Sequence, residues 1–102
     1  MDVIDHKERH RYELIDDDGE VVAIEVYHLN GDRITMVHTE VLREGKGHAR
    51  ILVDAALADA RSRGLGVLPE CSYVHRLIEK HPDLYLDLVP ADLRDHYGLP
   101  AA

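Results

Sequence analysis

The chain has 102 residues, and its 20 acidic against 12 basic side chains give it a formal net charge of −8. This length allows one hydrophobic core but not two, and the negative charge argues against nucleic acid and anionic membranes as partners, because both bind to positive surfaces. Apolar residues make up 45% of the chain, with no Phe or Trp, so we expect one compact domain over residues 1–102 with a core of Val, Ile, Leu and Ala.

Two features of the sequence bear on where the protein is located. The N-terminal residues are charged where a signal peptide would be apolar, and no apolar run approaches the length of a membrane span. A single cysteine, Cys71, excludes an internal disulfide framework and fits a reducing compartment. We therefore expect a cytoplasmic protein. The sequence indicates no particular oligomeric state.

Alternating polar and apolar residues predict strands in the first half of the chain. We expect residues 1–8 to be frayed, because they are polar, and residues 9–26 to form two antiparallel strands around an Asp-Gly turn. The acidic run in that turn, residues 16–18, lacks the ligand spacing of a calcium loop. The Asn-Gly pair at residues 30–31 predicts a second hairpin turn, after which a strand extends over residues 33–41.

A long helix is predicted over residues 46–63, where apolar side chains recur every three or four residues. Gly64 is a C-terminal stop signal, and residues 65–68 predict a short strand that ends at Pro69. A strand that follows a crossover helix returns parallel to an earlier strand of the same sheet. The predicted fold class is therefore α/β (α+β), with a mixed, mainly antiparallel sheet and a crossover helix.

The C-terminal third of the chain is predicted to contain further helices. Residues 71–80 have apolar side chains at helical spacing, and Pro82 halts this second helix. Residues 90–102 begin with a proline and include Gly98, which are typical helix start and stop signals. We expect this last segment to be a helical or flexible tail.

Two glycines separate the last predicted hairpin strand from the long helix. Gly45 and Gly47 allow a ligand to approach the backbone closely, and the free N–H groups of the first helical turn favour an anion. Arg43, Lys46 and Arg50 add positive charge around this loop. The loop could therefore bind an anionic ligand, or it could be a solvated basic loop tip. Its glycine spacing fits neither a P-loop nor a dinucleotide-binding fingerprint.

Five short sequence blocks follow one another along the chain. They read HTEV at 38–41, GKGHA at 45–49, RGLGV at 63–67, PECSYV at 69–74 and HP at 81–82. In order and spacing this series, within residues 9–89, resembles the GNAT superfamily of acyl-CoA N-acyltransferases, and in particular its compact N-acetyltransferase domain-containing subgroup. The resemblance implies a minimal GNAT-like fold. In that fold the sheet is splayed where strand 33–41 meets strand 65–68, and acetyl-CoA, the acetyl donor, lies in the opening.

The resemblance also implies which residues bind acetyl-CoA. Backbone N–H groups of the glycine loop would hold the pyrophosphate, with added charge from Arg43 and Lys46, and a strand N–H near Val41 or Leu42 would polarise the thioester carbonyl. The segment between Val41 and Gly45 is shorter than in the family. The full set of implied cofactor-binding residues is Val41, Leu42, Arg43, Gly45, Lys46, Gly47, His48 and Ala49.

Three residues are candidates for the catalytic chemistry. Cys71 opens the second helix, where a helix N-terminus can lower the pKa of a thiol, although by position alone it could equally be a small buried apolar residue. The resemblance places it near the acyl thioester, as nucleophile, as acid toward the CoA thiolate or as a contact. His38 could be the base for an incoming ammonium or a surface residue, and Tyr73 could supply an acidic hydroxyl or pack in the core.

The function that these residues and the resemblance imply is transfer of an acetyl group from acetyl-CoA to a primary amine. The chain has no residues to spare for the walls of an acceptor site, so this amine could belong to a protein or peptide. The alternative is a non-catalytic CoA-binding or protein-interaction module, which the shortened loop favours. The eight histidines include no set at zinc spacing, so no metal site is predicted.

Overall fold

The computed structural model describes residues 1–45 and 47–101, and its strands form one sheet in the order β1-β2-β3-β4-β5. The strands are β1 (Asp2–His6), β2 (Arg11–Ile15), β3 (Val21–Asn30), β4 (Arg33–Val41) and β5 (Gly66–Pro69). Neighbours from β1 to β4 are antiparallel, whereas β5 is parallel to β4. The mixed, mainly antiparallel sheet is therefore confirmed.

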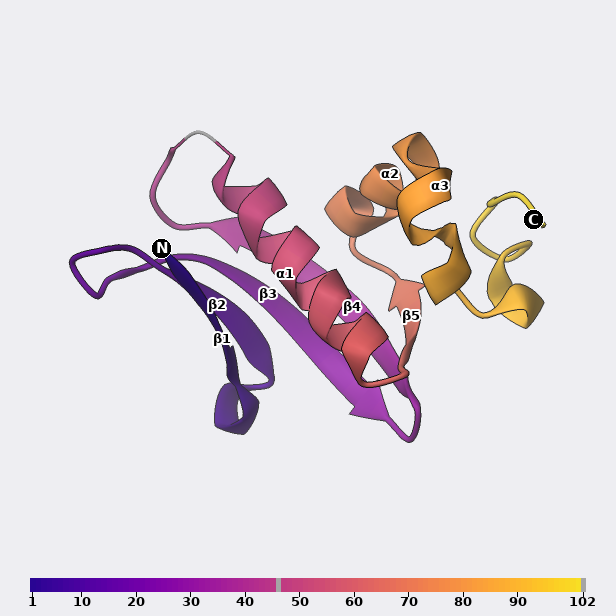
Figure 1. The fold of residues 1–102 in the computed structure, drawn as a ribbon, viewed down its shortest axis with the longest axis horizontal. Coiled ribbons are helices and arrows are strands. Elements are labelled where there is room, and N and C mark those ends of the chain that lie inside the picture. The colour runs from indigo at the N-terminus through magenta and orange to yellow at the C-terminus, as the bar shows by residue number, and fades with distance from the viewer. Residues whose placement is uncertain (46, 102) are drawn as a thin grey trace.

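Helix α1 (His48–Ser62) makes the crossover from β4 to β5 and lies across the sheet (Figure 1). It contacts all five strands. Its buried face is made of the apolar residues that recur at helical spacing, and the small alanines among them allow close approach to the sheet. These buried residues are Leu52, Val53, Ala56, Leu57 and Ala60, and they pack with Tyr12, Leu14, Ile34 and Met36 of the sheet.

The N-terminal residues form an edge strand, so the prediction that residues 1–8 are frayed is wrong. β1 pairs with β2 from Asp2↔Ile15 to His6↔Arg11, and a 3-10 turn, η1 (Lys7–Arg9), joins the two strands. Polar and charged residues are typical of edge strands, because they discourage pairing with other chains. The polar composition that suggested fraying is therefore that of a sheet edge.

The C-terminal third packs as short helices beside α1 (Figure 1). The predicted second helix is confirmed as α2 (Ser72–Lys80), which begins one residue later than expected because Cys71 is its N-cap. Further along lie α3 (Pro82–Tyr85), η2 (Leu86–Leu88) and η3 (Ala91–Leu93). The tail beyond Pro90 is held on the molecule by buried Leu99 and by the backbone carbonyl of Tyr97, which lies 2.8 Å from His75 Nε2.

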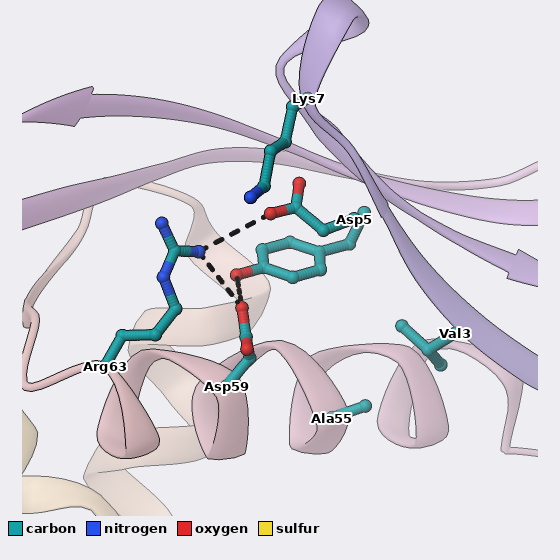
Figure 2. A pocket seen from close by; sticks show the side chains of 7 residues that line it. Val3, Asp5, Lys7, Ala55, Asp59 and Arg63 are labelled. Carbon is teal, nitrogen blue, oxygen red and sulfur yellow. Dashed lines mark hydrogen bonds and ion pairs between the residues drawn. The ribbon is translucent and has the colours of Figure 1, made fainter.

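A network of polar side chains joins the C-terminal half of α1 to β1 and β2 (Figure 2). The Tyr12 hydroxyl donates to Asp59 Oδ2 at 2.7 Å, and Arg63 Nη1 lies 3.2 Å from Asp59 and 3.4 Å from Asp5. These residues line a cavity of about 270 Å³, together with Val3, Lys7 and Ala55. Burial, reinforced by the Asp59 hydrogen bond, raises the pKa of Tyr12 well above its ordinary value. The network therefore holds a neutral tyrosine between sheet and helix.

None of the helices in residues 1–45 and 47–101 is both long enough and apolar enough to cross a membrane.

We predict that Asp59→Ala lowers the free energy of unfolding by about 1–3 kcal/mol, because it leaves the buried Tyr12 hydroxyl without an acceptor. Chemical denaturation measures this change. Asp92→Ala is the control, since it removes an exposed ion pair with Arg33 and should cost no more than about 1 kcal/mol. Equal losses in the two variants would show that the network does not stabilise the fold.

Candidate active site

A β-bulge in β4 determines which of its side chains face α1. The register between β3 and β4 skips Val37, which has no opposite partner. Side chains alternate between the two faces of a strand, and one inserted residue shifts that alternation. Before the bulge Ile34 and Met36 are buried in the core, whereas after it Thr39 contacts buried side chains and His38 is exposed. Without the bulge His38 would point inward.

The strands β4 and β5 separate at the bulge. They pair from Arg33↔Gly66 to Met36↔Pro69, and β4 then continues without β5 to Val41. Proline has no backbone N–H and ends a ladder. The backbone N–H of Cys71 makes the last backbone hydrogen bond between the diverging segments, donating to the Met36 carbonyl at 2.8 Å. Cys71 therefore lies at the vertex of the opening that the resemblance implied.

The backbone of β4 beyond this vertex offers hydrogen-bonding groups to the opening. Leu42 N–H donates to the Val22 carbonyl of β3 at 2.8 Å. Since backbone groups of successive residues in a strand point to opposite sides, those of Val41 and Thr39 are directed away from β3. Of the two amides expected near the thioester carbonyl, Val41 is thus the one on the open edge.

Three side chains from separate elements meet beside the vertex. The Thr39 hydroxyl of β4 donates to Glu25 Oε1 of β3, and its oxygen lies 2.9 Å from Cys71 Sγ. Glu25 is fully buried at 0% exposure, and Cys71 is 5% exposed. Glu25 Oε2 has no hydrogen-bond partner among the described residues. Buried polar atoms without partners are uncommon in proteins and often mark functional sites.

Burial raises the pKa of Glu25 to about 7, and hydrogen bonding from Thr39 and from the backbone of His38 opposes this rise only in part. A carboxyl group with this pKa exists in both protonation states near neutral pH, so it can hold or release a proton there. Glu25 and Thr39 were not among the residues predicted for the site. The available signal was a glutamate on the inward side of an alternating strand, between Ala23 and Tyr27.

The first turn of α1 has no side-chain cap. Gly47 is its N-cap, with φ 74°, and no side chain bonds to the first-turn amides. These N–H groups, which include those of His48 and Ala49, therefore remain available to an anion. The His48 ring occupies the space that a Cβ at Gly45 would need. A side chain at position 45 would therefore displace the His48 ring.

Arg43, which was expected to add charge at the pyrophosphate, contacts acidic side chains instead. The Arg43 guanidinium pairs with Glu20 and lies 3.5 Å from Asp16, so its charge is engaged by the β2–β3 hairpin. The Arg43 carbonyl lies 3.0 Å from His48 Nδ1. Lys46, expected to add charge at the pyrophosphate, lies outside the described residues.

A basic cavity of about 360 Å³ lies between α1 and α2. Arg50 pairs with Asp54 at 2.9 Å, whereas Arg76 and Lys80 form no ion pair within residues 1–45 and 47–101. The cavity thus carries unneutralised positive charge in a chain of net charge −8. Arg76 and Lys80 were not predicted, although their i, i+4 spacing on a predicted helix places them on one face. The complete lining is Arg50, Tyr73, Arg76, Leu77, Lys80 and His81.

The three predicted catalytic residues lie in three different surroundings. Cys71 contacts the buried Glu25–Thr39 pair, while Tyr73 lines the basic cavity, where burial raises its pKa. His38 is exposed on the opposite face of β4 from Thr39, and its Nε2 lies 3.3 Å from Glu40 Oε1. No hydrogen bond joins Cys71, Tyr73 and His38 to one another in the described part of the chain. The structure therefore divides the predicted catalytic set between two faces of the sheet.

No three His, Cys, Asp or Glu side chains of the described residues are grouped so that they could hold a metal ion.

Comparisons with known proteins agree on a family and a fold. The profile of the family described as GCN5-related N-acetyl-transferase matches residues 11–88. A solved structure with the same fold is the NMR solution structure of a GCN5-like N-acetyltransferase candidate from Staphylococcus aureus, with a TM-score of 0.66 and 24% sequence identity. The match covers 87% of each chain. No curated protein sequence matches the chain.

The raised pKa of Glu25 predicts that Glu25→Gln changes how stability depends on pH. An unfolded Glu25 ionises near pH 4.5, whereas the folded one stays neutral to about pH 7. The stability that neutral Glu25 contributes is therefore complete below pH 4.5 and is lost as pH rises to 7, by roughly 3 kcal/mol in total. In denaturant titrations between pH 4.5 and 7, the free energy of unfolding of the wild-type protein should therefore fall relative to that of Glu25→Gln.

Glu40→Gln is the matched control for this prediction, because the Glu40 side chain is half exposed on the same sheet. This variant gives the pH dependence that follows from the loss of an exposed carboxyl group. A stability difference between Glu25→Gln and wild type that stays constant across the interval would contradict the raised pKa.

Proposed function

The chain belongs to the GCN5-related N-acetyltransferase family, and from that premise we propose that it transfers an acetyl group from acetyl-CoA to a primary amine. The observation that carries the proposal is the separation of β4 and β5 after Met36, together with the uncapped first turn of α1, where Arg50 lines a cavity with Tyr73 of α2. An open strand edge can bind an extended chain through its backbone groups. A helix N-terminus can bind a phosphate group. CoA contains both.

In the proposed complex the pantetheine arm follows the open edge of β4. The backbone N–H of Val41 donates to the thioester carbonyl, where it stabilises the negative charge that develops on oxygen during attack. The pyrophosphate lies at the amides of residues 47–49, and Lys46 adds its charge. Arg76 and Lys80 in the basic cavity bind the remaining phosphate of the nucleotide, because both are free of ion pairs within the described residues.

The amine approaches from the sheet face that carries His38 and Glu40, whose side chains are 58% and 51% exposed. The Glu40 carboxylate attracts an ammonium group, and His38 or a water molecule takes its proton before attack. Cys71 or Tyr73 protonates the departing CoA thiolate. Because this face is open at His38 and Glu40, the acceptor amine can belong to a protein or peptide.

The rival proposal is a module that binds CoA or a partner protein without catalysis. Two contacts of the loop favour it. Arg43, which would add charge at the pyrophosphate, is engaged by Asp16 and Glu20, and the His48 ring fills the space beside Gly45. Both contacts would reduce the anion affinity of the loop, and turnover measurements separate the two proposals.

We predict that acetyl-CoA binds in isothermal titration calorimetry and that Arg76→Ala/Lys80→Ala weakens this binding about tenfold, or about 1.4 kcal/mol. The loss reflects two missing phosphate contacts, so it should shrink at high salt. Arg33→Ala is the control, since Arg33 pairs with Asp92 outside the cavity. Failure of the wild-type chain to bind acetyl-CoA at millimolar concentration would contradict both the enzyme and the CoA module.

Release of free CoA thiol from acetyl-CoA, measured with a mixture of small amines and lysine-containing peptides, tests the acetyl transfer itself. We expect release that depends on an amine and falls far more in Cys71→Ala than acetyl-CoA binding does. Binding without release for any acceptor would favour the non-catalytic module. An unchanged rate in Cys71→Ala would remove this thiol from the chemistry.

A further inference from the structure

We propose that Glu25, Thr39 and Cys71 form a proton relay for the departing thiol. In this relay Cys71 donates its proton to the CoA sulfur, and Glu25 replaces that proton through the Thr39 hydroxyl. The inference rests on the proposed function, because it names the group that completes the transfer. Cys71 is the catalytic residue of the relay, while Glu25 and Thr39 act through it as positioning residues.

The contacts of the relay are continuous from the protein interior to the strand opening. Thr39 Oγ1 touches Glu25 Oε1 on one side and Cys71 Sγ, at 2.9 Å, on the other. Glu25 is fully buried, whereas Cys71 lies at the vertex where β4 and β5 separate. A proton that leaves Glu25 therefore has a hydrogen-bonded path through Thr39 to Cys71.

The hydrogen bonds of the relay can reverse their direction. When Glu25 is ionised it only accepts, so the Thr39 hydroxyl must donate to it and the Cys71 thiol donates to Thr39. When Glu25 is neutral it can donate to Thr39, whose own proton then points to the Cys71 sulfur. Either atom of the Thr39–Cys71 contact can be the donor. A hydroxyl between two titratable groups in this way can pass a proton in both directions.

The proton affinities of the groups favour transfer toward the leaving thiolate. Cys71 and the CoA leaving group are both thiols, so proton transfer from Cys71 to the CoA sulfur converts one thiol into a thiolate as it forms the other thiol. Burial raises the pKa of Glu25 to about 7, which keeps a proton available near neutral pH and still lets it pass to a thiolate. The N-terminus of α2 stabilises negative charge on Cys71 while its proton is being replaced.

The balanced step begins when the amine nitrogen attacks the acetyl carbonyl carbon. The carbon–sulfur bond breaks, and its electron pair remains on the CoA sulfur, which takes the proton of Cys71. The Cys71 thiolate takes the Thr39 proton, and the Thr39 oxygen takes the proton of Glu25. Glu25 is left ionised after CoA has left as the thiol. Water at the strand opening then gives a proton to Cys71, whose own proton passes through Thr39 back to Glu25. The proton lost by the amine passes to His38 or water.

The kinetic test compares Thr39→Val, which removes the hydroxyl, with Thr39→Ser, which keeps it. We expect kcat for CoA release to fall about a hundredfold or more in Thr39→Val and in Glu25→Gln. Thr39→Ser should keep most of the activity, and the Kd for acetyl-CoA should be unchanged throughout, which also shows that the variants fold. Combining Glu25→Gln with Thr39→Val should cause no further loss, because both interrupt one path.

Additive losses, or equal activity in Thr39→Val and Thr39→Ser, would overturn the relay. Wild-type protein that releases no CoA with any amine would instead contradict the proposed function, so a second measurement does not depend on turnover. Cys71 is the only cysteine, and carbon-13 labelling of cysteine therefore gives one Cβ resonance. Its chemical shift should change with pH in a step near the pKa of Glu25, and this step should vanish in Glu25→Gln and Thr39→Val.

The groups around Glu25 support assigning the pH-dependent step in the Cys71 chemical shift to the titration of Glu25. Across the sheet Glu25 faces Tyr12 on one side and Thr39 on the other. Tyr12 is hydrogen-bonded to Asp59, and its pKa is raised, so it stays neutral in this range. Beyond it, the Arg63 guanidinium is paired with Asp5 and Asp59 and keeps its charge. A wild-type Cys71 resonance without a step near pH 7 would overturn the relay whatever the turnover.

Discussion

One unpaired residue in β4 determines the arrangement on which the proposed site depends. Because Val37 has no partner in β3, the alternation of side chains is shifted beyond it. Thr39 consequently reaches the interior, and His38 lies on the open face. The pairing with β5 ends beside the same residue, so the bulge, the strand opening and the Cys71 vertex coincide. The placement of groups on both sides of the opening thus follows from one irregularity in the sheet.

The buried Glu25 carboxyl beside this opening destabilises the fold but supports the proposed chemistry. A carboxylate without full hydrogen bonding is unfavourable in a protein interior, so Glu25 stays neutral to higher pH than an exposed glutamate. An apolar residue in its place would stabilise the fold more readily. Under the proposed function the same burial supplies a proton where a thiolate is formed. The buried Tyr12 hydroxyl differs from Glu25 in this respect, because it has a partner in Asp59.

Local patterns were sufficient to predict most of the elements. The Asn-Gly turn and the alternation after it gave the bounds of β4, and the helical spacing of apolar residues gave α1 and α2. The edge strand β1 was missed because polar residues are common both in edges and in frayed ends. The bulge depends on pairing with β3, and the partners of Arg43 lie more than twenty residues away, so neither follows from local sequence. Sequence motifs were sufficient to nominate Cys71 and the glycine loop as candidates, whereas the burial of Glu25 and the basic cavity depend on tertiary packing.

The proposed function requires that acetyl-CoA occupies the opening between β4 and β5. Backbone amide chemical shifts, recorded by NMR during titration with acetyl-CoA, test it most directly. We expect the largest changes at Thr39, Val41, residues 47–50 and Cys71, with smaller ones at Arg76 and Lys80. Changes concentrated instead around Asp5, Tyr12 and Arg63, which line the cavity on the β1 side of the sheet (Figure 2), would contradict it.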